Sequence, residues 1–79
     1  MNKHYYFENH TLHVNDTKGV ELLVKQISDV QSDDEMAHEN EDELYEAVLK
    51  EIVKGNPEAR SMAAGALKTK LIDFARWCA

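Results

Sequence analysis

Apolar and polar residues alternate along the first fifteen positions of the chain, a pattern typical of a half-buried β-hairpin. Asn9 and His10 suit a two-residue turn, because asparagine tolerates a positive φ. The register set by this turn pairs apolar residues across the strands on one face: Phe7 with Leu12, and Tyr5 with Val14. We therefore predict an antiparallel hairpin over residues 3–15.

The pattern then changes to a helical period. Four apolar residues follow at spacings of i, i+3, i+4 and i+7: Val20, Leu23, Val24 and Ile27. Three residues ahead of them could supply the N-cap: Asn15, Asp16 and Thr17. This segment predicts a first helix over residues 17–29.

A second helix is predicted over residues 33–54. Ser32 and Glu35 fit a capping box at its start, and Gly55 supplies a C-terminal stop. Like charges four residues apart, such as Glu35 and Glu39, weaken its first half and leave open a loop near residues 38–41. We favour one helix that frays at its start.

The third predicted helix covers residues 57–78, with Asn56 as N-cap and Pro57 as first helical residue. Its apolar residues share one stripe: Ala63, Leu67, Leu71, Phe74 and Cys78. The order of elements is ββααα, an α+β fold in which an N-terminal two-stranded antiparallel hairpin packs against three helices. We expect one small domain spanning residues 1–79.

The predicted core joins the apolar face of the hairpin to the apolar stripes of the helices. A chain of 79 residues buries only a small core, so few side chains belong to it. The predicted members are Tyr5, Phe7, Leu12, Val14, Val20, Leu23, Val24, Ile27, Leu44, Val48, Ile52, Leu67, Leu71 and Phe74.

The net charge is −6, and it is unevenly distributed. Residues 1–46 carry three basic and twelve acidic side chains, whereas residues 47–79 carry six basic and three acidic ones. The single cysteine excludes an intrachain disulfide and fits a reducing compartment. The sequence has no signal-peptide core and no apolar run that could span a membrane, so we expect a cytoplasmic protein.

Motifs for metal binding or catalysis are missing from the sequence. His4, His13 and Glu8 share one face of the hairpin, but they do not form the ligand spacing of a zinc site. The acidic run at residues 32–46 lacks the central glycine of a calcium loop. With no nucleophile motif or phosphate-binding loop either, we expect neither an enzyme nor a bound metal or other cofactor.

The acidic run is the most distinctive stretch, with eight carboxylates and no lysine or arginine in residues 32–46. Such a run serves either as a solvated helix face or as a surface that attracts a basic partner. We favour a non-catalytic protein-binding or regulatory module that presents this acidic helix surface to a basic macromolecule. The predicted partner-binding residues are Asp33, Asp34, Glu35, Glu39, Glu41, Asp42, Glu43 and Glu46. Small acidic α+β proteins of this kind resemble, in size and charge, the accessory proteins of phages and other mobile elements.

The alternative function is DNA binding. The second and third predicted helices could form a helix–turn–helix-like pair whose last helix carries four cations: Arg60, Lys68, Lys70 and Arg76. These cations are scattered around that helix, and the chain as a whole is acidic. Nucleic acid is therefore the less favoured partner.

Self-association is also expected. A two-stranded sheet has open edges, and several apolar or small residues lie off the main stripe of the last helix. A homodimer could cover them. The predicted dimer interface consists of Met62, Gly65, Ile72 and Trp77.

Overall fold

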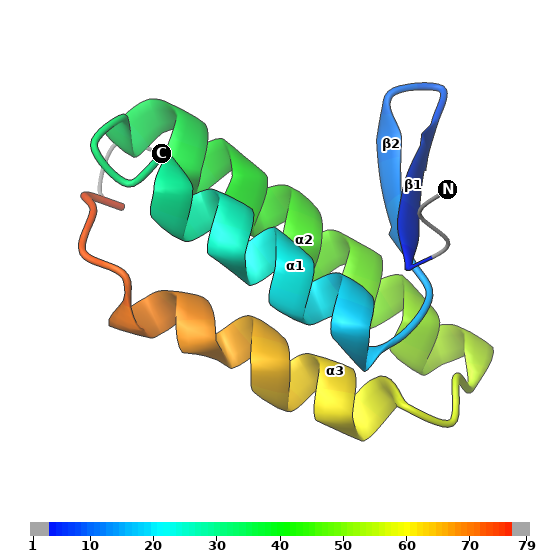
Figure 1. Ribbon diagram of the computed structural model, residues 1–79. Helices are drawn as coiled ribbons and strands as arrows, with labels where there is room; N and C mark the ends of the chain where they lie inside the picture. The colour runs from blue at the N-terminus through cyan, green and yellow to red at the C-terminus, as the bar shows by residue number, and fades with distance from the viewer. Residues whose placement is uncertain (1–3, 77–79) are drawn as a thin grey trace.

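The computed structural model describes residues 4–76, in which a two-stranded hairpin is followed by three helices (Figure 1). The elements are β1 (Tyr5–Glu8), β2 (Thr11–Val14), α1 (Thr17–Asp29), α2 (Asp34–Lys54), α3 (Ala59–Ala66) and a 3₁₀ helix, η1 (Leu67–Leu71). Each α-helix packs against the other two, and β2 lies against α2. The predicted ββααα order and α+β fold are confirmed.

The hairpin has the predicted turn and register. Asn9 and His10 have φ values of 52° and 65°, and the strands pair Tyr5 with Val14 and Phe7 with Leu12. β2 buries its apolar side chains, but Phe7 on the outer strand is 60% exposed. The prediction that Phe7 belongs to the core is wrong, because β2 lies against α2 and β1 forms the outer edge.

The first two helices begin at aspartate caps. Asp16 accepts a hydrogen bond from the Gly19 amide at 2.8 Å, and Asp33 accepts one from the Met36 amide at 3.1 Å. The second cap is therefore Asp33 rather than the predicted Ser32. α2 runs undivided to Gly55, whose φ of 82° ends the helix in the left-handed conformation. None of the described helices is long and apolar enough to cross a membrane.

The predicted third helix over residues 57–78 is wrong at both ends. The Asn56 side chain accepts a hydrogen bond from the Glu58 amide at 2.8 Å, so Asn56 and Pro57 form a turn ahead of α3. At the other end the α-helix tightens into η1, and the chain becomes extended at Ile72. The change of period breaks the predicted stripe, and Leu67 and Leu71 are 63% and 87% exposed.

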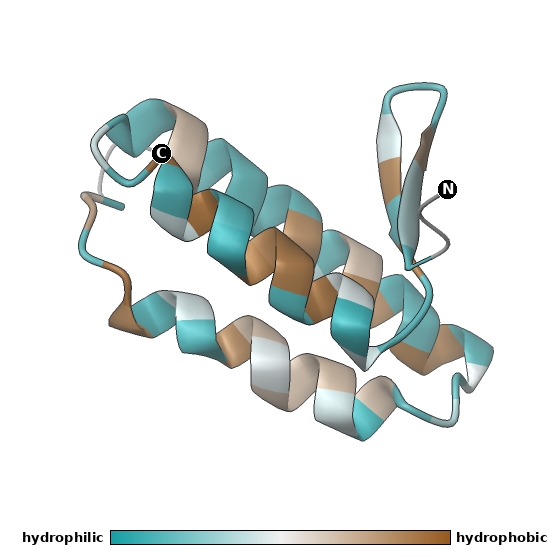
Figure 2. Ribbon diagram, viewed as in Figure 1, coloured by the Kyte–Doolittle hydropathy of each residue, from teal (hydrophilic) through white to brown (hydrophobic). Residues whose placement is uncertain are grey.

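The face that α3 and η1 bury consists mainly of small residues. Its members are Met62, Gly65, Ala66 and Thr69, spaced i, i+3, i+4 and i+7. A Cβ atom at Gly65 would lie 3.1 Å from Val20 Cγ1, so the missing side chain lets α3 approach α1 closely. In Figure 2 most of α3 has the pale shades of intermediate hydropathy, without the strong brown that appears on α1.

The core lies where β2 and the helices meet. Its buried apolar members are Leu12, Val14, Val20, Leu23, Ile27, Ala37, Leu44, Ala47, Val48, Met62, Ala66 and Phe74. Tyr5 and Val24 pack against this cluster while partly exposed. Ile52 is 43% exposed, because it borders a groove between α2 and α3 instead of entering the core as predicted.

Candidate functional site

The eight acidic residues predicted to bind a partner divide into two groups. Three have roles within the fold: Asp33 caps α2, Asp34 accepts a hydrogen bond from the Ala75 amide at 3.0 Å, and Glu41 is buried. The others lie on the surface or at its edge: Glu35, Glu39, Asp42, Glu43 and Glu46. The run is therefore not one uniform surface.

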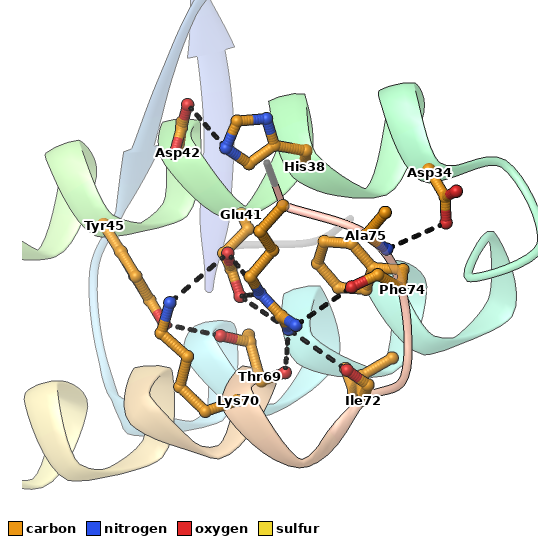
Figure 3. A network of polar contacts seen from close by, with 11 residues as sticks. Asp34, His38, Glu41, Asp42, Tyr45, Thr69, Lys70, Ile72, Phe74 and Ala75 are labelled. Carbon is orange, nitrogen blue, oxygen red and sulfur yellow. Dashed lines mark hydrogen bonds and ion pairs between the residues drawn. The ribbon is translucent and has the colours of Figure 1, made fainter. Parts of the chain in front are cut away.

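Glu41 is 2% exposed, so the prediction that it faces a partner is wrong. It lies on the same side of α2 as Ala37, Leu44 and Val48, which are all buried. The spacing of i, i+4, i+7 and i+11 through these residues was the signal in the sequence that could have placed Glu41 on the core side. Figure 3 shows its carboxylate among the polar groups that surround it.

An arginine near the C-terminus neutralises the Glu41 carboxylate. Arg76 Nε donates to the two carboxylate oxygens at 3.1 and 3.2 Å, and Nη2 donates to Oε2 at 3.2 Å. Lys70 Nζ lies 3.8 Å from Oε1. Thr69 also bonds to Glu41, and its hydroxyl oxygen lies 2.6 Å from that of Tyr45. Every polar group that enters this part of the core therefore has a partner.

Arg76 also holds the chain that follows η1. Its guanidinium donates to the carbonyl oxygens of Thr69 at 2.7 Å, Ile72 at 3.1 Å and Phe74 at 3.2 Å. It also lies 3.8 Å above the Phe74 ring, within range of a cation–π contact. One side chain thus satisfies carbonyl groups that the end of η1 leaves open and fixes residues 72–76 over the core.

The electrostatic setting keeps Glu41 ionised. Burial alone would raise the pKa of its carboxyl group, but hydrogen bonds from Arg76 and Thr69 outweigh burial, with help from the charges of Arg76 and Lys70. The net result is a pKa below the ordinary value for glutamate. Glu41 is therefore a paired structural anion and does not attract a partner.

The surface carboxylates of α2 line a groove beside the hairpin. This groove has a volume of about 310 Å³ and is open to solvent. Its hairpin wall is formed by His10, Thr11 and Leu12, and its α2 wall by Glu39, Asp42, Glu43 and Glu46. We call these seven residues the acidic groove. The hairpin thus turns one side of an acidic helix into a concave site.

The charges of the acidic groove are only partly balanced. Asp42 Oδ2 lies 3.7 Å from His38 Nε2, and Glu46 pairs with Lys50 at 3.1 Å. Glu39 and Glu43 form no ion pair with any residue between 4 and 76. The groove therefore keeps a net negative charge that an added cation could neutralise.

Contacts at the base of the hairpin fix the position of the groove wall. His4 Nδ1 lies 2.9 Å from Asp16 Oδ2, and the His4 carbonyl accepts the Asn15 amide at 2.8 Å. The Asn56 side chain donates to the Asn15 carbonyl at 2.9 Å, which ties the α2–α3 turn to the end of β2. At Gly19 a Cβ atom would collide with the His4 carbonyl oxygen, so only glycine permits this close approach.

The carboxyl groups at this base also have shifted acidities. Burial would raise the pKa of Asp16, but the His4 hydrogen bond and the Gly19 amide bring it below the ordinary value. The Asn56 hydrogen bond lowers the pKa of Glu51, burial opposes this, and Lys54 lowers it further. Both groups are therefore stabilised as anions in the folded chain.

The residues predicted as a dimer interface do not form a surface. Met62 is fully buried, Gly65 packs against Val20, and Ile72 is partly buried against the core. Trp77 lies outside the described residues. The prediction is wrong for Met62 and Gly65 because α3 turns this side toward α1.

The four cations predicted for DNA binding are not equivalent. Arg76 and Lys70 both contact Glu41, and Arg76 is largely enclosed. Arg60 and Lys68 are exposed, and neither forms an ion pair within the described part of the chain. Two of the four charges are therefore used to neutralise a buried carboxylate.

The histidines of the hairpin take part in local contacts. His13 stacks on Tyr6, with ring centroids 4.8 Å apart, and His4 contacts Asp16. Across residues 4–76, no three histidine, cysteine, aspartate or glutamate side chains converge in a way that could hold a metal ion. The acidic groove is thus a cluster of carboxylates spread along a wall and not a coordination site.

Comparison of the chain with protein families, with curated proteins and with solved structures found no match. The acidic groove and the surfaces next to it are therefore the features from which a function can be inferred.

Proposed function

We propose that the protein is a non-catalytic binding module that holds a basic segment of a partner protein in the acidic groove. The observation that carries this proposal is the concave wall formed by Glu39, Asp42, Glu43 and Glu46 opposite the hairpin. A concave site desolvates a bound side chain on more than one side, so each charge contact is stronger there than on an open helix face.

The chemistry of the groove favours arginine or lysine side chains. Glu39 and Glu43 offer carboxylate oxygens that no cation of the described chain neutralises. A guanidinium can bind a carboxylate through two parallel hydrogen bonds, which gives an arginine-rich segment both affinity and orientation. Thr11 on the hairpin wall can contact the aliphatic part of such a side chain.

The direct test is a calorimetric titration of the full chain with a nine-residue polyarginine peptide at about 0.15 M salt, where the Debye length is only about 8 Å. The Glu39→Gln/Glu43→Gln variant removes two groove charges without changing side-chain size, and we expect about tenfold weaker binding. The control is Glu21→Gln/Asp29→Asn on α1, which changes the net charge equally at two exposed positions outside the groove. Its affinity should change less than about twofold, because exposed distant charges are screened.

Equal weakening in both variants would contradict the proposal, since binding would then depend on net charge alone. A pull-down from the native host provides the second test, with wild type compared to a Glu39/Asp42/Glu43→Lys variant. Glu41 is left intact because its replacement would disturb the core. Recovery of the same proteins in equal amounts by both chains would show that the acidic groove is not the binding site.

A further inference from the structure

A second surface of the molecule is apolar. Four large side chains lie next to one another on α2 and η1 with much of their area in solvent: Leu49 (61% exposed), Ile52 (43%), Val53 (87%) and Leu67 (63%). We call these four residues the Leu49 face. They leave on the order of 500 Å² of apolar surface exposed, as large as the largest patch on a typical monomer.

Two hollows make this face continuous. One, of about 250 Å³, lies between α2 and α3 and has an apolar lining that includes Leu49, Ile52, Ala63 and Leu67. The other, of about 410 Å³, lies between His13 and the last turns of α2 and contains Leu49 and Val53. Leu49 belongs to both hollows, so a partner placed over it would contact both.

Charge changes sign along α2 at Leu49. Asp42 and Glu46 precede it on the exposed side of the helix, whereas Lys50 and Lys54 follow it. Glu46 and Lys50 pair within the chain at the point where the sign changes, and both remain well exposed. A partner of uniform charge would be repelled at one end of this face.

We propose that the Leu49 face binds a second copy of the same chain through a two-fold contact. In an antiparallel α2–α2 contact centred on Leu49, the acidic turns of one copy lie beside Lys50 and Lys54 of the second copy. The contact is then complementary at both ends, as an isologous interface requires. The apolar area with its charged rim approaches the roughly 800 Å² per partner of a standard stable interface.

This dimer shares Asp42 and Glu46 with the acidic groove, but it does not need Glu39 or Glu43, so the Glu39→Gln/Glu43→Gln variant should still dimerise. It differs from the interface that the sequence predicted, since Met62 and Gly65 are buried within the monomer. Its apolar centre consists of the side chains that the packing of α3 leaves in solvent.

Sedimentation equilibrium of the full chain, over about 10 to 500 µM, tests the proposal. We expect wild type to dimerise and Leu49→Lys/Val53→Lys to raise the dissociation constant at least about a hundredfold, because each lost contact occurs twice. The control is Phe7→Lys/Leu71→Lys, at positions that are 60% and 87% exposed and that lie outside both hollows. The control should dimerise like wild type, and circular dichroism should show the same helix content in all three proteins.

A monomeric wild type across this range would overturn the proposal. Loss of the dimer in the control but not in the Leu49→Lys/Val53→Lys variant would also overturn it, because the contact would then involve the hairpin or the end of η1.

A mixing experiment tests the antiparallel arrangement. In the homodimer of the Glu46→Lys variant, position 46 of each copy places a lysine beside Lys50 of the other copy. In the homodimer of the Lys50→Glu variant, position 50 of each copy places a glutamate beside Glu46 of the other copy. A mixed pair restores opposite charges at both ends, so in an equimolar mixture native mass spectrometry should show about three quarters of the dimers as heterodimer, compared with about one half for random pairing. A random share of heterodimer would overturn the antiparallel contact.

Discussion

α1 and α3 pack against each other, yet they bury opposite kinds of side chain. α1 buries large branched residues, among them Val20, Leu23 and Ile27. α3 buries Gly65 and Ala66 beside Met62, while Leu67 at its end points to solvent. A helix can therefore face the core mainly with small residues when a close helix–helix distance gains more contact than burying the leucine that follows it would.

The reason lies in the distance between the two helices. Where α3 presents Gly65, a Cβ atom would lie only 3.1 Å from Val20 Cγ1 of α1, so this side chain of α1 packs closely over the glycine. Large residues on one helix thus fill the room left by small residues on the other, as close packing requires. Leu67, which this arrangement leaves outside the core, then contributes to the Leu49 face.

The contrast is tested most strongly by truncating Leu23 on α1 and Leu67 at the start of η1, directly after α3. Leu23→Ala removes a buried side chain and should lower the free energy of unfolding by about 3 kcal/mol. Leu67→Ala removes an exposed one and should change it by less than about 0.5 kcal/mol. Urea denaturation at low protein concentration, where self-association is negligible, measures both. Equal losses of stability would mean that Leu67 is buried after all.

The second test concerns the chain that follows α3. Glu41→Gln leaves Arg76 without its anionic partner and should lower the free energy of unfolding by about 2 kcal/mol. The loss is smaller than for a fully enclosed pair because the Arg76 side chain is 25% exposed. Glu41→Leu/Arg76→Met, which replaces both charges with apolar groups, should recover most of the stability. If it did not, the carbonyl contacts of Arg76 would matter more than its charge pair.

The dependence of stability on pH gives a second test of the Glu41–Arg76 pair. Because the folded state lowers the pKa of Glu41, the unfolded chain binds the proton more tightly. The contribution of the Glu41 carboxylate to the free energy of unfolding should be fully present above about pH 5. It should be lost as the pH drops below about 4.5 and through the lower pKa that Glu41 has in the folded state. The Glu41→Leu/Arg76→Met chain should show a shallower decline in this range. Asp16 and Glu51 keep it from becoming flat, because their pKa values are also lowered.

The smallest expected effect is at Gly65. Gly65→Leu forces α1 and α3 apart, but it also gains the higher helix propensity of leucine, so we expect a net loss of about 1 kcal/mol. Gly65→Ala should be nearly neutral, because the contact with Val20 at 3.1 Å opposes a gain of similar size. Thermal unfolding resolves the difference. A stabilised Gly65→Leu variant would show that the helices do not need this close approach.

The hairpin and the first two helices could be predicted from the sequence because their signals are local. Asn9 and His10 set the register, and the spacing of Val20, Leu23 and Ile27 marked the buried side of α1. The end of α3 could not be predicted in the same way. Its change to a 3₁₀ helix and the return of Arg76 to Glu41 depend on residues 35 positions apart.

The candidate site was predictable only in part. The acidic run was visible in the sequence. Which of its carboxylates stabilise the fold and which remain on the surface depends on the face of α2 to which each residue belongs. The groove itself requires the hairpin to stand beside α2, a distant contact that leaves no local pattern. The Leu49 face could not be predicted because the spacing of Ile52 and Leu67 is typical of core residues. In the structure both side chains are exposed.

The anchoring of the hairpin at one end has a mechanical consequence. His4 ties its base to Asn15 and Asp16, while the turn at Asn9 and His10 is exposed. Because the buried Leu12 also packs β2 against the helices, only the turn can bend away from the anchored strands, and thermal motion should be largest there. Amide hydrogen exchange should then be slowest at Asn15 and fastest near His10. Since His10 and Thr11 form one wall of the acidic groove, the width of the groove should fluctuate with this bending and narrow around a bound basic segment.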